Sequence, residues 1–259
     1  MYALATQLNS TNNRSLWLAI LGLTDQFIHD RIDLARYNAD YKHFKAEVLN
    51  FNMTTEEQLL ATPQQRDGNP LQQGQIEPSE ELRFFMYRHW NLFDSMYHSR
   101  FVAVKLGIWT AQGQHQLEVL LAKMGIPKAE CQQPFAAMQR QYKDELATLL
   151  DAYGRQFNLT NLHYKSFITR RGALVVSAAD VVTAITALLE SAAPDLEAVK
   201  RSADGTVGDL GDQLRRARQR HFWMAYDALS TASNSAEGLH SSLRFKNTLI
   251  LLIFLRVQR

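Results

Sequence analysis

Apolar residues recur at helical spacing through the first two thirds of the chain. Between residues 13 and 50 they return every three or four positions in two runs, which is the period of an amphipathic helix. The first run contains Leu16, Ile20, Leu23, Phe27 and Ile28, and the second contains Tyr37, Tyr41, Phe44 and Val48. We therefore expect two helices in this segment.

The apolar period stops after residue 60 and restarts near residue 79. Residues 61–78 combine glutamine, proline and glycine without apolar spacing, which is typical of an exposed linker. Ser79 can cap a new helix, and Glu80 and Glu81 favour its positive end. Three helices are expected beyond this point, one through the aromatic residues that follow, one over 113–125 and one from Pro134 to Gly154.

The apolar period changes in the last third of the chain. Residues 162–169 predict a strand, whereas 177–191 and 207–229 have the spacing of helices. Ser177 followed by Asp180 resembles a capping box with aspartate in place of glutamate.

The chain ends in a short apolar run, Leu249–Leu255. It is far shorter than the ~20 residues of a membrane span, so it predicts a buried strand and no membrane contact. Because a buried strand needs neighbours on both sides, we expect the chain to be a fragment of a longer protein.

Together these patterns predict a mostly α chain that becomes α+β. Four segments are expected, namely a helical segment over 1–60, a linker over 61–78, a helical region over 79–154 and an α+β region over 155–259.

The run from Leu82 to Trp109 is dense in aromatic residues and also carries acidic and imidazole groups. If it begins as one continuous helix, a single face collects Leu82, Met86, His89, Trp90, Phe93 and Tyr97. Such a helix is usually buried between other elements, which predicts core. The alternative is a metal or acid–base site formed by His89, Asp94 and His98. On one helix His89 would point away from the other two, so the core interpretation is favoured.

The composition excludes several classes of protein. Of the 259 residues, 46% are hydrophobic and 21% are charged, as in globular domains. The formal net charge of +2 is too small to indicate nucleic-acid binding unless a local basic surface exists. The single cysteine, Cys131, excludes a disulfide framework and has no histidine beside it in sequence to activate it. Motifs for a nucleophile elbow, a phosphate loop or a zinc protease are missing, so neither cofactor nor metal is expected.

Two basic clusters are candidate binding residues. They consist of Arg170 and Arg171 in the first cluster and of Arg215, Arg216, Arg218 and Arg220 in the second. One interpretation is a solvated helix face and loop. The other is contact with phosphate groups or an acidic partner, because the planar guanidinium group binds both. Leu214, Phe222 and Tyr226 are expected to pack the second cluster's helix against the protein.

Several stretches resemble the cell division control protein 45 family of eukaryotic replication factors. They lie in order between about Leu16 and Ser191, and the run Arg88–Met96 is the most specific among them. The stretches are LWLAILGLTDQFI, YRHWNLFDSMYHS, KLGIWTAQGQHQLEVLLAKMGIP, CQQPFAAM and SAADVVTAITALLES.

The resemblance implies a fold like that of RecJ-type DHH phosphoesterases, in a family regarded as having lost nuclease activity. It implies a nuclear DNA replication initiation factor that joins the minichromosome-maintenance ring and the GINS complex in the replicative helicase and binds single-stranded DNA. Residues 155–259 would be a truncated DHH-associated domain, with the N-terminal DHH-like domain outside this chain. We therefore expect no enzymatic activity.

Two other interpretations remain open. The chain could be a fragment of an active DHH-type phosphoesterase or single-strand nuclease whose catalytic half lies elsewhere. It could also be a generic helical interaction module.

Overall fold

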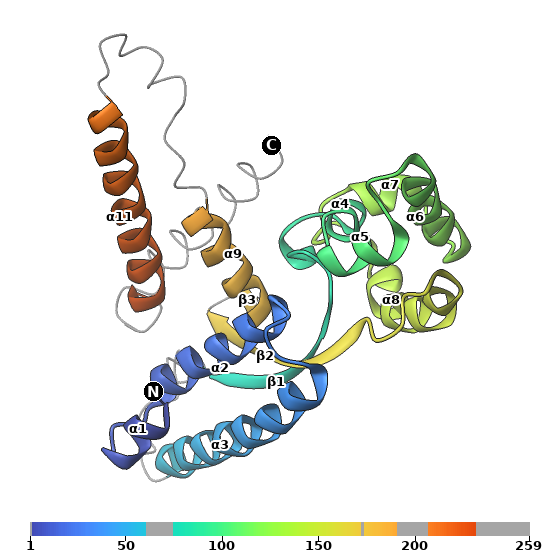
Figure 1. The fold of residues 1–259 in the computed structure, drawn as a ribbon. Helices are drawn as coiled ribbons and strands as arrows, with labels where there is room; N and C mark the ends of the chain where they lie inside the picture. The colour runs from blue at the N-terminus through green and yellow to red at the C-terminus, as the bar shows by residue number, and fades with distance from the viewer. Residues whose placement is uncertain (1, 61–74, 172–173, 191–206, 232–259) are drawn as a thin grey trace. The chain divides into compact units, whose positions relative to one another are not determined.

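The computed structural model describes residues 2–60, 75–171, 174–190 and 207–231 (Figure 1). This part of the chain is mostly helical and contains a three-stranded sheet in the order β1-β2-β3. It divides into two compact units, of which the first combines Met1–Pro78 with Phe167–Arg259 and the second is Ser79–Ser166. The first unit thus joins the N-terminal helices to the C-terminal part of the chain. The linker residues 61–74 and the apolar run Leu249–Leu255 lie outside the described residues.

The first unit contains the predicted helices as α2 and α3, and two further helices from the C-terminal part. Its described elements are α1 (Tyr2–Gln7), α2 (Asn13–Ile28), α3 (Leu34–Leu60), β3 (Leu174–Ser177), α9 (Ala178–Glu190) and α11 (Val207–Thr231). The helices α2, α3, α9 and α11 confirm the corresponding apolar patterns. Strand β2 (His163–Arg171), also predicted, pairs antiparallel with β3, with Ile168 opposite Ser177.

Helix α2 is central to the first unit because it packs against both α3 and α9 (Figure 1). It begins with a capping box in which the Asn12 side chain accepts from the Ser15 backbone and the Ser15 hydroxyl accepts from the Asn12 backbone. Its Phe27 stacks on the fully buried Tyr37 of α3 with ring centroids 4.3 Å apart. Burying each such ring contributes about 2–3 kcal/mol to the stability of the unit.

The second unit is a group of short helices around one apolar core. Its elements are η2 (Tyr87–His89), α4 (Leu92–Tyr97), α5 (Arg100–Leu106), α6 (Ala111–Lys123), α7 (Lys128–Gln132), α8 (Arg140–Tyr153) and η3 (Gly154–Phe157). The core collects Leu92 and Met96 of α4, Val102 of α5, Leu117 and Leu120 of α6 and Leu150 of α8, all fully buried.

The helix predicted to start at Ser79 is wrong, because this segment is strand β1 (Ile76–Leu82). Pro78 is compatible with the strand because β1 lies at the edge of the sheet, where proline is tolerated. Glu81 does not favour a helix end. It is buried and lies 2.6 Å from the Arg88 guanidinium group.

The prediction of one continuous helix through the aromatic run is also wrong, although the run does supply core. Met86 has a left-handed backbone with φ 47°, which ends any helix there. Asn91 then caps α4 and Ser99 caps α5 by accepting from backbone N–H groups three residues on. The side chains of Tyr87, Leu92, Met96, Val102, Leu106 and Ile108 are buried, so the core interpretation of this run is confirmed.

One helix boundary differs from the prediction, and one short helix was not predicted. The helix expected from Pro134 begins at Arg140, because Pro134 pairs with Asn91 in an isolated bridge and the Phe135 N–H donates to the Trp90 carbonyl. Helix α7 was not predicted, since five residues are too few to show an apolar period.

The corner between α5 and α6 is held by two glycines. Gly107 ends α5 with φ 65°, a conformation that other residues rarely adopt. A Cβ added at Gly113, in the first turn of α6, would lie 2.1 Å from the Gly107 carbonyl oxygen. Backbone thus packs directly on backbone at this corner.

We predict that Gly113→Ala lowers the free energy of unfolding by about 2–4 kcal/mol, because the added methyl group must displace backbone. Gly22→Ala is the matched control. Gly22 lies inside α2 with nothing within 4 Å of an added Cβ, so alanine should stabilise by about 0.5–1 kcal/mol. Urea unfolding followed by circular dichroism measures both, and an unchanged Gly113→Ala variant would contradict the packing described.

Candidate functional site

The second basic cluster lies on the exposed part of α11. Arg215, Arg216, Arg218 and Arg220 are all exposed, and residues 213–226 contain these four arginines and no acidic residue. Arg215 forms an ion pair with Asp212 one turn away, which contributes little at an exposed position. The helix therefore presents a local excess of positive charge.

Helix α11 packs on α9 through small and polar side chains. Ala225 is 5% exposed, and the His221 imidazole donates from Nδ1 to the Leu188 carbonyl oxygen of α9 at 2.8 Å. The expectation that Phe222 and Tyr226 pack this helix down is wrong, because both side chains are 52% exposed. The side chain of Leu214, the third residue of that expectation, lies outside the described part of the structure. Ala217, His221 and Ala225 recur every four residues, and this spacing was the sequence signal for the packing face.

The outward side of α11 carries three aromatic rings beside the arginines. The sequence analysis predicted that two of them, Phe222 and Tyr226, are buried by packing, and it assigned no role to the third, Trp223. Phe222, Trp223 and Tyr226 are each half exposed. Trp223 meets the other two rings edge to face, with centroids 5.4 Å and 5.6 Å apart. We call Arg215, Arg216, Phe222, Trp223 and Tyr226 the α11 surface.

Helical spacing places the arginines in line with the rings. Arg215, Phe222 and Tyr226 follow one another at seven and four residues, and Arg216 precedes Trp223 by seven. Seven residues are two helical turns, or about 10 Å along the axis. Each stripe thus combines a cation with an aromatic face, which is the combination that binds the phosphates and bases of single-stranded nucleic acids.

The first basic cluster lies on a different element. Arg170 and Arg171 end β2, where their backbones pair with Val175 and Leu174 of β3. The structure thus puts the two predicted clusters on a strand and on a helix of the same unit.

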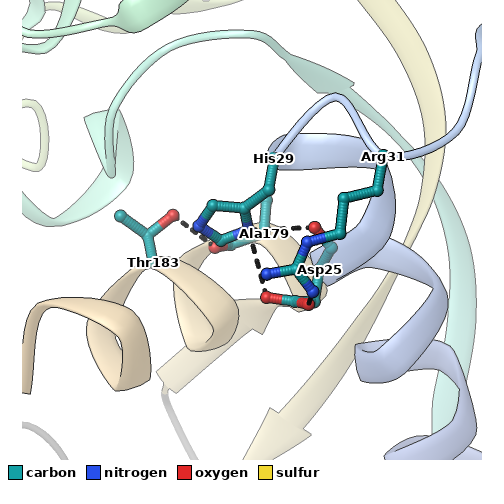
Figure 2. A network of polar contacts seen from close by, with 5 residues as sticks. All are labelled: Asp25, His29, Arg31, Ala179 and Thr183. Atoms are coloured by element: carbon teal, nitrogen blue, oxygen red, sulfur yellow. Dashed lines mark hydrogen bonds and ion pairs between the residues drawn. The ribbon is translucent and has the colours of Figure 1, made fainter. Parts of the chain in front are cut away.

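A group of polar residues at the end of α2 lies beside α9 and could be mistaken for a catalytic triad. Figure 2 shows His29 extending from the end of α2 toward Ala179 and Thr183 of α9. Its Nδ1 donates to the Asp25 carbonyl at 2.9 Å and lies 3.1 Å from the Asp25 carboxylate, which also binds Arg31. The Thr183 hydroxyl donates to the Ala179 carbonyl of its own helix at 2.7 Å. A hydroxyl that donates to a backbone carbonyl is not activated as a nucleophile. The contacts among Asp25, His29 and Arg31 therefore stabilise the end of α2.

The other candidate reactive groups are also engaged in structure. The Asp94 carboxylate accepts from the Asn91 amide at 2.7 Å, and the His98 ring stacks on Trp90. Burial, together with the charge of Glu130, raises the pKa of the Cys131 thiol to about 11, so it is protonated at neutral pH. Within the described residues no group of three or more histidine, cysteine or acidic side chains could hold a metal ion. None of the described helices is long and apolar enough to cross a membrane.

Comparison with known proteins identifies the family. The sequence model of the CDC45 family matches residues 1–254. The chain belongs to the CDC45 family. It is 42% identical over 211 residues to the Cell division control protein 45 homolog of Dictyostelium discoideum, covering 74% of this chain and 33% of that protein. It is 31% identical over 198 residues to the human homolog, covering 75% of this chain and 33% of that protein. The resemblance seen in the sequence is thereby confirmed.

A solved structure agrees with this assignment. The crystal structure of CDC45 from Entamoeba histolytica matches 97% of this chain and 44% of that chain, with a TM-score of 0.66 and 25% sequence identity. The chain thus spans about a third of the length of the curated CDC45 relatives described and under half of the crystallised protein.

Proposed function

We propose that this chain acts in the initiation of DNA replication as a non-catalytic factor in the nucleus. The observation that carries the proposal is the match of the CDC45 family over nearly the whole chain. In this proposal the chain belongs to the replicative helicase, with the minichromosome-maintenance ring and the GINS complex as its partners. Residues 155–259 are assigned to a truncated DHH-associated domain.

The non-catalytic role is supported by the engagement of the reactive side chains. His29 and Asp25 hold a helix end, and the raised pKa of Cys131 keeps its thiol protonated. A fragment of an active DHH-type nuclease remains the alternative, since a catalytic half could lie in the two thirds of the family length that this chain does not span.

Binding of single-stranded DNA is assigned to the α11 surface. Its arginines offer charge to phosphates, and its exposed rings offer faces on which bases stack. Arg218 and Arg220 extend the charge along the same helix. Arg170 and Arg171 remain predicted contacts at the end of β2.

Replacing Arg215, Arg216 and Arg218 by alanine should weaken binding to oligo(dT). Each arginine that contacts a phosphate releases condensed counterions from the DNA, so each lost contact reduces this favourable release. The slope of log K against log salt should become less steep by about 0.7 per contact. Fluorescence anisotropy at several salt concentrations measures both effects. Trp223→Ala should lower affinity by about tenfold through lost stacking and leave the salt slope unchanged.

Two matched controls accompany this test. Arg36, Arg140 and Arg155 are exposed arginines on elements other than α11, so their triple alanine variant has the same net charge as the α11 variant. Trp109→Ala removes another exposed tryptophan, which belongs to the other unit. If the α11 triple variant keeps the salt slope of the unchanged chain, the arginines are solvated surface and the assignment is wrong.

Membership of the helicase complex predicts that the tagged chain retains the purified minichromosome-maintenance ring and GINS together on an affinity resin. The same preparation, incubated with single-stranded DNA and manganese, should leave the DNA intact. Failure to retain either partner would refute complex membership for this part of the family. Metal-dependent cleavage that co-elutes with the chain would favour the nuclease alternative.

A further inference from the structure

A pocket lies in the second unit where α4, α6 and α7 meet. Helix α7 packs against both of the other helices (Figure 1). The cavity has a volume of about 220 Å³. Pockets that bury a drug-sized ligand measure ~300–1,000 Å³, so this volume suits a single side chain of a partner better than a cofactor. The lining residues are Phe93, Glu118, Leu121, Ala122, Ile126 and Lys128.

The floor of the pocket is held by the backbone at the end of α6. The Gly125 N–H donates to the Ala122 carbonyl at 3.0 Å, and Gly125 has a left-handed backbone with φ 71°. The Ile126 N–H donates to the Leu121 carbonyl at 3.3 Å. These two bonds form a Schellman motif, which places Leu121 and Ile126 in apolar contact, and the two residues are 5% and 3% exposed. The floor is therefore formed before a partner arrives, which reduces the entropy lost on binding.

The rim of the pocket carries an exposed ion pair. The Lys128 ammonium group of α7 lies 3.0 Å from the Glu118 carboxylate of α6, and their side chains are 66% and 48% exposed. The half-buried Phe93 ring of α4 completes the wall. The ion pair offers a hydrogen-bond donor and an acceptor side by side. A charged group of a ligand would meet a rim charge of its own sign, so the site favours an apolar body with a neutral polar tip.

We propose that this pocket binds the side chain of a tyrosine presented by another protein. The phenol ring has an apolar body for the Leu121 and Ile126 floor and a face for the Phe93 ring. Its hydroxyl both donates and accepts, so it donates to Glu118 and accepts from Lys128 without separating the ion pair. Phenylalanine lacks this group, and the tryptophan N–H only donates. The proposal goes beyond the DNA-binding role and does not depend on it, because every lining residue belongs to the second unit.

The test adds N-acetyl-tyrosinamide to the full chain while methyl resonances are recorded by NMR. We expect the Leu121 and Ile126 methyl resonances to shift and the shifts to saturate. N-acetyl-phenylalaninamide offers the same ring without the hydroxyl. It should bind about fivefold more weakly, the loss expected for one hydrogen bond.

Filling the pocket should block the probe. Ala122 is an exposed lining residue, so Ala122→Leu occupies the cavity without enlarging a core side chain and should abolish the shifts. Ala111→Leu is the matched control, because Ala111 is also exposed and lies about three turns earlier on the same helix. It should leave the affinity unchanged. Circular dichroism checks that each variant keeps its fold.

A ratio of affinities tests the rim ion pair. Combining Glu118→Ala with Lys128→Ala removes both polar partners of the hydroxyl, so the tyrosine and phenylalanine amides should then bind equally. A variant that merely loosens the pocket weakens both amides alike and keeps the ratio of the unchanged chain. A kept ratio would therefore contradict the role of the ion pair.

The proposal also fails if the tyrosine probe leaves both methyl resonances in place, or if Ala122→Leu keeps the response of the unchanged chain. Equal binding of the two amides to the unchanged chain would make the pocket a purely apolar site. Methyl shifts that depend on protein concentration without any probe would make it an interface between two copies of the chain. Either result would overturn the assignment of a partner's tyrosine to this pocket.

Discussion

The contact between α11 and α9 determines what the C-terminal helix offers to solvent. Within the described side chains of α11, the His221 ring donates to the Leu188 carbonyl of α9, and Ala225, one turn further on, is buried. Because the small residues of α11 take the inner side, its large rings and arginines take the outer side. A helix whose buried residue is an alanine while its aromatic rings are exposed is unusual in a folded domain. This arrangement of small inner and large outer residues gives α11 a basic and aromatic surface.

In both units, polar side chains stabilise the ends of helices. In the first, Asp25, His29 and Arg31 form a network that fixes the end of α2, beside α9. In the second, capping side chains and a glycine contact fix the corner between α5 and α6. Histidines and carboxylates that could suggest catalysis thus serve helix ends.

Sequence pattern predicted the long amphipathic helices α2, α3, α9 and α11 because several turns of apolar spacing outweigh local variation. It failed between residues 76 and 109, where short capping signals at Asn91 and Ser99 and the left-handed Met86 override helical spacing. The strand β1 was missed because Ser79 and two glutamates imitate a helix start. For the candidate site, the arginines were found from composition. The rings were not, since an aromatic residue on a helix normally predicts burial and only the tertiary contact with α9 shows otherwise.

Photo-crosslinking with peptide mapping tests whether the outward face of α11 contacts single-stranded DNA, as we propose. An oligo(dT) strand carrying 5-iododeoxyuridine forms bonds with aromatic side chains stacked on the modified base. We expect crosslinks at Phe222, Trp223 or Tyr226 that disappear at high salt as the phosphate contacts weaken. Crosslinks confined to other segments of the chain, with α11 peptides unmodified, would contradict it.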